Sequence, residues 1–236
     1  MVPPVNSRRP YRSPLRADHA RQTRRRVLAA AEALFLARGY AGTTIGAVAE
    51  AAGVSADTVY TALGGKRGLL EGVIAHEIDD PDDPAQVDQQ RRRDEIGAVT
   101  DPAERLRRLV ALSCETLART SPVHLVIRGA ADGHPFAAEL RARMLRRRLE
   151  IQHRHVESYL GAALRAGLGL DDAARRYSAL LCPELYHLLT TECGWAPDQY
   201  RAWVVEVLRT DLLGHRQPAG HAADVVSRSP GTTPAP

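Results

Sequence analysis

A tight turn between two short segments of helical spacing is the most informative feature of this 236-residue sequence. The segments cover residues 44–51 and 55–63, and Gly53 stands in the turn, where a positive φ is needed. Ala49 is small enough to let two helices cross closely, and Ser55 is a favoured N-cap residue. These features predict a helix-turn-helix, in which two short helices cross steeply over a tight turn. The apolar residues that can fill the wedge between the helices are Ile45, Val48, Val54 and Val59.

The outer face of the second helix has side chains that can recognise double-stranded DNA. Helical spacing turns Val59 and Leu63 inward, which leaves Asp57 and several small or hydroxyl-bearing side chains outside. Alanine and threonine can contact a thymine methyl group, aspartate can accept from cytosine N4, and hydroxyls can bind phosphates. Lys66 adds a cation at a predicted helix N-terminus, a position that itself favours anions. We therefore expect DNA contacts from Thr43, Thr44, Ser55, Ala56, Asp57, Thr58, Tyr60, Thr61 and Lys66.

A longer pattern surrounds this motif and spans residues 21–74. It consists of the run from Thr23 to Phe35, then Arg38-Gly39-Tyr40, Thr43-Thr44-Ile45, Ala49 to Val54, Ser55, Thr58-Val59-Tyr60 and Lys66. With this pattern the sequence resembles the DNA-binding region of tetracycline-repressor (TetR) family regulators. It departs from the family at Leu63, where an aromatic residue is usual, and at Arg67, where an acidic residue is common.

The resemblance implies a fold, contacts and an assembly that the motif alone does not. Thr44, Tyr60 and Lys66 would contact phosphates, and residues 55–61 would enter the major groove. The chain would form a homodimer through its last two helices, about 171–193 and 197–213, which would build a four-helix interface.

The composition predicts an all-α protein. Hydrophobic residues make up 44% of the chain but aromatic residues only 5%, so the core must consist mainly of Ala, Leu and Val. Together with abundant Arg and Glu, these residues favour helices. The net charge is +4, and eight arginines precede Val27 against a single acidic residue, which suggests a polyanionic partner.

Spacing and composition divide the chain into five parts with about nine helices. We expect a disordered basic arm over residues 1–20, a three-helix helix-turn-helix domain with a connecting helix over 21–78, a linker or irregular loop over 79–100, a helical regulatory domain for ligand binding and dimerisation over 101–214 and a disordered tail over 215–236. The expected helices begin at Thr23, Thr44, Ser55, Lys66, Pro102, Ser121, Phe136 (to about Ala166), Asp171 (to about Cys193) and Pro197, with a kink or break at Pro183.

Sparse polar groups on the apolar helices of the regulatory part are typical of a small-molecule pocket. The candidate ligand-binding residues are Cys114, His124, Arg128, Tyr159, Tyr177 and Tyr186, although for any one of them a structural role is the commoner outcome. The run Arg146-Arg147-Arg148 is interpreted as a solvated helix face. Because His153 and His155 point to different faces of a helix, and a five-residue spacing from Cys182 to His187 is poor for ligation, we predict no metal or cofactor.

Together with the resemblance, these observations predict a cytoplasmic, ligand-responsive transcriptional regulator. The resemblance implies a repressor, which a small-molecule effector would release from a palindromic DNA operator. The alternative is a sequence-neutral or architectural nucleic-acid-binding protein that relies on the N-terminal arginines. An enzyme is not expected, since the sequence has no nucleophile elbow, phosphate-binding loop or paired acid–base motif. Three cysteines without a CxxC fit a reducing compartment, and no apolar stretch approaches the roughly 20 residues of a membrane span.

Overall fold

Helices account for the regular structure of the described part of the chain. The computed structural model describes residues 14–79 and 84–214, and within them no strand is present, which confirms the all-α prediction. The helices are α1 (Pro14–Gly42), α2 (Ile45–Ala52), α3 (Ala56–Leu63), α4 (Lys66–Asp79), α5 (Pro84–Gly97), α6 (Pro102–Ala131), α7 (Pro135–Leu160), α8 (Leu170–Leu180), α9 (Pro183–His187) and α10 (Pro197–Leu208). Short turns of other types follow three of them: the 3-10 turn η1 (Gly161–Ala163) and the π-helical turns η2 (Leu188–Glu192) and η3 (Arg209–Leu213).

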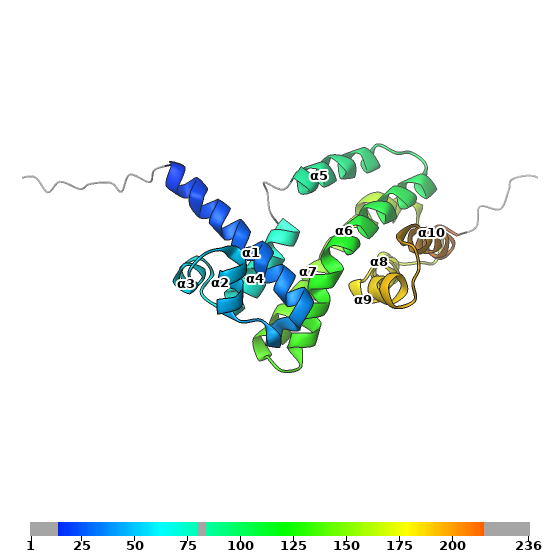
Figure 1. The fold of residues 1–236 in the computed structure, drawn as a ribbon. Coiled ribbons are helices and arrows are strands. Elements are labelled where there is room, and N and C mark those ends of the chain that lie inside the picture. Colours follow the sequence, from blue (N-terminus) through cyan, green and yellow to red (C-terminus); the bar gives the residue numbers. More distant parts are fainter. Residues whose placement is uncertain (1–13, 80–83, 215–236) are drawn as a thin grey trace, which may run out of the picture.

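The long helices α6 and α7 form an antiparallel pair across the middle of the molecule (Figure 1). Helices α1–α4 pack on one side of this pair, and α8–α10 lie on the other side. Helix α5 packs along α6. The α6–α7 pair is therefore the element that connects the N-terminal helices with the C-terminal ones.

Two apolar cores lie along the α6–α7 pair. The first contains the buried residues of α1–α4, among them Val27, Phe35 and Leu70, and it also contains Val123 and Ile127 of α6. The second joins the other half of the pair to α8–α10. Its largest fully buried side chains are Leu106, Leu109, Leu160, Tyr177, Leu181, Tyr200, Leu208 and Leu212. Because the first core includes residues of α6 and α7 as well as those of α1–α4, the N-terminal helices are not a separate folding body.

Helix α1 begins nine residues before the expected start at Thr23, at Pro14. Residues 14–20, expected in an irregular arm, are therefore helical, while the rest of the expected arm and the expected tail lie outside the described residues. Arginine and alanine favour helix in this stretch, and Asp18 pairs with Arg21 at the favourable i, i+3 spacing. The helix is interrupted at Gly39, whose φ of 66° and ψ of 174° are non-helical, close to the expected end.

The segment over residues 79–100, expected as a linker or an irregular loop, is helical from Pro84 to Gly97, which corrects the irregular loop. The segment is polar on most of its surface, so its spacing shows little apolar periodicity, yet it has favourable pairs along the helix, such as Gln90 with Asp94. Its contacts to α6 hold it in place. Arg92 pairs with Glu115, and Gln89 Nε2 donates to Thr116 Oγ1 over 3.2 Å.

The two helices expected on either side of Ser121 form one continuous helix, α6, with Pro122 inside it. A proline in a helix interior removes one backbone hydrogen bond and costs about 3 kcal/mol. Here the ring is exposed, while Val123 and Ile127 directly after it are buried in the first core. Tertiary packing of the flanking turns therefore offsets the local cost.

The boundaries around α7 and α8 also differ from the expected ones. Helix α7 ends at Leu160 rather than Ala166, because the following segment is held by η3: the Arg165 backbone N–H donates to the Leu212 carbonyl over 2.8 Å. Helix α8 starts with Gly169 as its N-cap, and Asp171 pairs instead with His153 at 3.0 Å. The break expected at Pro183 is confirmed.

Within residues 14–79 and 84–214, no helix combines the length and the apolar character that crossing a lipid bilayer requires.

Two helical glycines offer a test of this packing. A Cβ added to Gly68 in α4 would lie 1.6 Å from the Leu63 carbonyl oxygen, whereas a Cβ on Gly129 in α6 would meet nothing within 4 Å. We expect Gly68→Ala to lower the free energy of unfolding by about 3 kcal/mol or more, because backbone must move. Gly129→Ala should raise it by up to about 1 kcal/mol, as alanine favours helix. Urea unfolding measures both, and equal effects would contradict the close approach of α3 and α4.

Candidate nucleic-acid interface

Helices α2 and α3 form the helix-turn-helix that the sequence predicts, with both helix starts capped by hydroxyls. Thr44 Oγ1 accepts from the Ala47 backbone N–H over 3.2 Å, and Ser55 Oγ accepts from the Thr58 N–H over 3.1 Å. Gly53 closes α2 in the left-handed region, with φ 63° and ψ 43°. The expected roles of Gly53 and Ser55 are confirmed, because the turn geometry and the cap require these residue types.

The orientation of α3 is set by two apolar residues. Val59 is fully buried and Leu63 nearly so, and both belong to the first core. The opposite face of α3 is open, and Tyr60 is 55% exposed there although it is a large aromatic side chain. The other exposed or partly exposed residues of the predicted DNA surface on this helix and its cap are Ser55, Ala56, Asp57, Thr58 and Thr61.

Lys66 stands at the first position of α4, close to the end of α1. Its Nζ donates to the Ala41 carbonyl over 3.1 Å and lies 4.5 Å from the centre of the Tyr40 ring. Partial burial lowers the pKa of Lys66 below its usual value. The lysine thus has a fixed position at a helix N-terminus, where anions are favoured.

Thr43 does not belong to this surface, unlike the other residues predicted with it. It is 1% exposed, and its hydroxyl donates to the Gly39 carbonyl over 2.9 Å. The hydroxyl satisfies a carbonyl at the end of α1, where the left-handed Gly39 interrupts the helix. Thr43 therefore has a structural role, and Thr44 next to it is the exposed one.

Two N-terminal arginines have structural contacts that the sequence pattern does not reveal. Arg24 Nη1 donates to the Ala62 carbonyl over 2.8 Å, near the C-terminal end of α3. Arg26 Nη2 donates to the carbonyls of Ala52 and Gly53 at the end of α2. These cations satisfy carbonyls that helix ends leave unpaired, so part of the arginine excess before Val27 holds the motif against α1.

The six candidate ligand-binding residues do not meet at one site. Cys114, Tyr177 and Tyr186 belong to the second core, where burial raises the pKa of the Cys114 thiol to about 12. The Tyr177 hydroxyl bonds to Ser113 Oγ at 2.8 Å, and the Tyr186 ring packs edge-on against Tyr200. These three side chains have structural roles in the state described.

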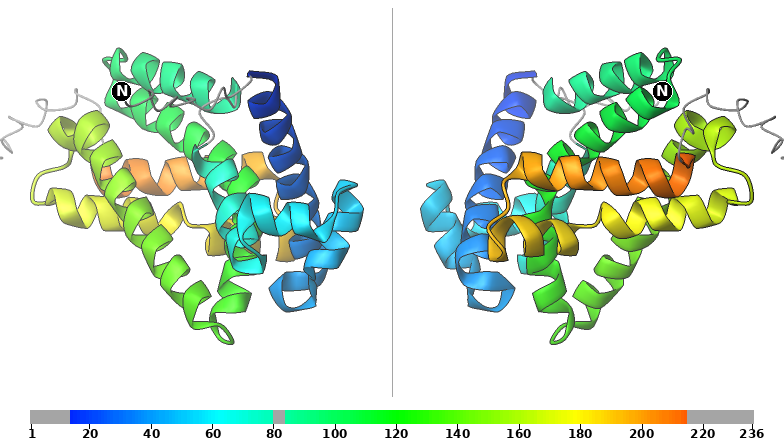
Figure 2. Two further views of the ribbon diagram at one scale, coloured as in Figure 1. Left: turned by 90° about the vertical axis from the view of Figure 1, so that its left-hand side faces the viewer. Right: turned by 90° about the vertical axis from the view of Figure 1, so that its right-hand side faces the viewer.

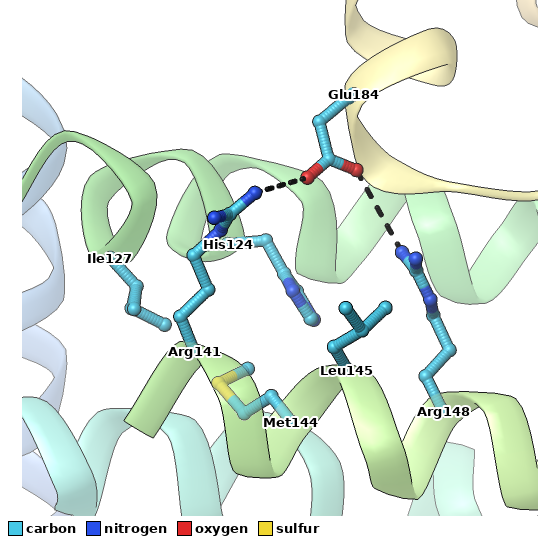
Figure 3. Close-up of a pocket in the computed structure, with 7 residues that line it drawn as sticks. All are labelled: His124, Ile127, Arg141, Met144, Leu145, Arg148 and Glu184. Atoms are coloured by element: carbon cyan, nitrogen blue, oxygen red, sulfur yellow. Dashed lines mark ion pairs between the residues drawn. The ribbon is translucent and has the colours of Figure 1, made fainter. Parts of the chain in front are cut away.

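The remaining three candidates lie apart from one another. Arg128 is exposed on α6. Tyr159 on α7 packs against the His155 ring and lies near Gly97, at the end of α5. His124 lines a small pocket between α6, α7 and α9 (Figure 3). Desolvation by burial lowers the pKa of His124 to about 4, so its ring is neutral near pH 7.

The pocket contains charged residues that sequence analysis missed. Arg141 and Arg148 of α7 both pair with Glu184 of α9 (Figure 3). Arg148 was interpreted as part of a solvated face, but its side chain is only 22% exposed. The three residues are up to 43 positions apart in the sequence, so spacing alone gives no sign that they meet. Within residues 14–79 and 84–214, no group of three or more His, Cys, Asp or Glu side chains could hold a metal ion.

Comparison with protein families supports the assignment of the N-terminal helices. Residues 27–73 match the family described as bacterial regulatory proteins, tetR family. This segment runs from the buried face of α1 to the middle of α4 and includes the whole helix-turn-helix. No significant match was found among curated proteins.

Solved structures of regulators share the fold over nearly their whole length. NalD from Pseudomonas aeruginosa, the secondary repressor of the MexAB-OprM multidrug efflux pump, is 22% identical, and the alignment covers 84% of this chain and 99% of NalD with a TM-score of 0.61. A transcriptional regulator from Saccharomonospora viridis in complex with choline is 22% identical over 82% of this chain and 98% of its own, with a TM-score of 0.63. A TetR-family regulator from Syntrophomonas wolfei is 16% identical, and the alignment covers 80% of this chain and 94% of that regulator with a TM-score of 0.63. The fold is thus shared over at least 80% of this chain.

The cap at the start of α3 can be tested without DNA. Ser55→Ala should lower the free energy of unfolding by about 1 kcal/mol, because the Thr58 N–H loses its acceptor. Thr61→Ala removes a hydroxyl from the exposed face of the same helix and should change the free energy of unfolding by less than about 0.5 kcal/mol. Both values come from urea titration followed by circular dichroism. Equal losses would show that the Ser55 cap does not stabilise the motif.

Proposed function

Since this chain belongs to the TetR family of bacterial transcriptional regulators, we propose that it is a ligand-responsive repressor that binds a palindromic operator as a homodimer. The observation that carries the proposal is the open face of α3. Helix α3 is capped by Ser55, and the buried side chains of Val59 and Leu63 fix its orientation. The N-terminus of α4, with Lys66, lies beside its open face. A helix presented in this way fits the major groove of B-DNA.

The residues of this surface divide into two roles. Tyr60 on the exposed face of α3, Thr44 at the start of α2 and Lys66 at the start of α4 offer hydroxyls and a cation, which suits phosphate contacts that position the protein. Ala56, Asp57 and Thr61 lie on α3 itself, where side chains can reach base edges. Ser55 and Thr58 are joined at the start of the helix, with their hydroxyl oxygens 2.9 Å apart.

The proposed dimer interface is the face formed by α8, α9 and α10. These helices lie side by side on the C-terminal side of the molecule (Figure 2). Leu188 in η2 is 43% exposed there, and Trp195 and Trp203 pack edge-on with ring centres 5.8 Å apart while both remain partly exposed. Partly exposed aromatic and aliphatic side chains are typical of subunit interfaces. A two-fold dimer would present two copies of α3 about 34 Å apart, which matches one turn of DNA.

The response to an effector is proposed to pass through α6 and α7. Their residues complete the core of α1–α4, and Arg143 of α7 pairs with Glu71 of α4 at 3.6 Å. A small molecule that prefers a different arrangement of these helices lowers DNA affinity in proportion to its differential binding. Two of the structural neighbours support this mode, since NalD is a repressor and the Saccharomonospora viridis regulator was solved with choline.

DNA recognition is tested with the intergenic DNA upstream of the protein's own gene against a scrambled duplex at about 150 mM salt. We expect a preference of roughly a thousandfold for the native sequence. We expect roughly tenfold weaker binding to the native sequence for Lys66→Gln and for Tyr60→Phe, because each variant loses a phosphate contact. Lys66→Gln should also reduce the slope of log affinity against log salt concentration by about one. Tyr159→Phe, which removes the same hydroxyl far from this surface, is the matched control and should leave affinity unchanged.

Two outcomes would contradict this assignment. Equal affinity for native, scrambled and genome-selected duplexes would support an architectural role instead of an operator. If Tyr159→Phe lost as much DNA affinity as Tyr60→Phe, the Tyr60 hydroxyl on α3 would have no specific role in DNA binding.

The dimer is tested by placing a charge on its proposed interface. Leu188→Glu should convert the dimer to a monomer in sedimentation velocity, because a buried carboxylate without a partner costs several kcal/mol. Leu36→Glu makes the same change at an equally exposed leucine of α1, 45% exposed, and should leave the dimer intact. A dimer that survives Leu188→Glu would place the interface on another face.

A further inference from the structure

The pocket between α6, α7 and α9 has a mixed lining of apolar and charged side chains (Figure 3). Ile127, Met144 and Leu145 supply an apolar wall. Arg141 and Arg148 stand beside it, and Glu184 enters from α9. Since His124 is neutral near pH 7, the pocket holds two cations and one anion. An apolar wall next to an excess of positive charge fits an amphipathic anion.

Glu184 neutralises the two arginines only loosely. Its Oε1 lies 3.8 Å from Arg141 Nη2, and its Oε2 lies 3.8 Å from Arg148 Nη1. A good charge-assisted hydrogen bond between these groups is about 2.7–2.9 Å long, so each contact is almost 1 Å longer than the optimum. The carboxylate of Glu184 spans the two guanidinium groups without a close hydrogen bond to either.

One pocket residue, Arg148, has a buried Nε without a hydrogen-bond partner among the described residues. Two further buried atoms, Ser121 Oγ and Gln152 Oε1, also have none, although their residues do not line the pocket. Ser121 lies one helical turn before His124 on α6, and Gln152 lies one turn after Arg148 on α7, so both share a face with a pocket residue. Buried donors and acceptors are normally paired, because leaving one unpaired costs about 1–3 kcal/mol. The unpaired Arg148 N–H in particular is a free donor for an anionic ligand.

We propose that the effector of this regulator carries a carboxylate, which binds Arg141 and Arg148 in place of the Glu184 side chain, while its apolar part packs against Ile127, Met144 and Leu145. Glu184 then acts as an internal substitute for the ligand's carboxylate in the effector-free state. This inference rests on the proposed function, since it names the ligand class of the same regulator. A guanidinium pair is suited to carboxylates because its N–H groups match both oxygens.

The pocket must open for such a ligand to enter. The space between its side chains is about 30 Å³, which holds a water molecule but no organic acid. Glu184 stands in the first turn of α9, two residues after Cys182, where the chain breaks between α8 and α9. Displacement of Glu184 would break the ion pairs that link this short helix to α7, so that α9 can shift against its packing on α6 and enlarge the pocket. The helix that moves is part of the face proposed for dimerisation, which links the ligand to the arrangement of the two subunits.

The full-length protein is titrated by calorimetry with hexanoate and phenylacetate, and with hexanamide and phenylacetamide as uncharged analogues of the same shape. Concentrations up to about 10 mM detect dissociation constants as weak as about 1 mM. We expect binding of at least one acid and of neither amide. Arg148→Gln should weaken that binding at least tenfold, because the ligand loses a charge-assisted pair.

Two further variants separate the role of Glu184 from a general effect of charge. Glu184→Gln removes the internal competitor with little change of shape and should tighten acid binding roughly tenfold, by about 1.4 kcal/mol. Arg146→Gln makes the same charge change as Arg148→Gln on an exposed position of α7 that does not line the pocket. It should leave acid binding unchanged. Circular dichroism confirms that each variant is folded.

Several results would overturn the proposal. They are an absence of binding by both acids, equal binding of acid and amide, binding that survives Arg148→Gln, and a Glu184→Gln variant that binds no better than the parent. Operator binding is measured separately with and without the acid. Arg148-dependent acid binding that leaves operator affinity unchanged would support the site and contradict the effector response, so the two failures are distinguishable.

Discussion

The interaction on which the rest of the structure depends is the packing of α6 and α7 into the core of the N-terminal helices. Val123 and Ile127 of α6, with Ala137 and Leu140 of α7, lie in the same buried cluster as the residues of α1–α4. The helix-turn-helix segment is too short to bury an adequate core by itself, since small domains gain little from burial. The orientation of α3 is therefore fixed relative to α6 and α7, and a movement of these helices moves the DNA-binding surface with them.

The rim of this shared core adds directional contacts to its apolar packing. The Tyr40 ring, at the end of α1, meets His134 edge-on at 5.0 Å between centres and Phe136 at 5.4 Å, and Lys66 Nζ lies over the same ring. One aromatic side chain thus touches α1, the α6–α7 turn and the start of α4. Because packed interiors resist continuous deformation, a shift of α7 is expected to displace this junction as a unit.

Local features of the fold could be predicted from the sequence because nearby residues determine them. The caps at Thr44 and Ser55 and the left-handed Gly53 involve partners within a few positions, and the inward direction of Val59 follows from helical spacing. Features with distant partners could not be predicted. The helix α5 depends on α6 residues such as Glu115, which lies 23 positions after its partner Arg92. The burial of Thr43 is a local exception, since the partner of its hydroxyl, Gly39, is only four positions away and the burial depends on where α1 is interrupted. Pro122 predicts a helix boundary because its local cost is visible in the sequence, whereas the contacts that compensate for it come from distant residues.

The pocket between α6, α7 and α9 also depends on residues that lie far apart in the sequence, and its position suggests how a ligand would affect the other proposed surfaces. Its charged residues come from α7 and α9, and each of these helices also serves another proposed surface: α7 supports the DNA-binding helices through Arg143 and Glu71, and α9 lies on the dimer face. Glu184 bridges the two helices with ion pairs of 3.8 Å, which are weaker than the apolar packing around them. A weak bridge between two well-packed elements is the contact that a ligand of modest affinity can replace. In the proposed response, the energy that a carboxylate gains from the two arginines would change the position of α9 relative to α7, and the shared core would transmit that change to α3.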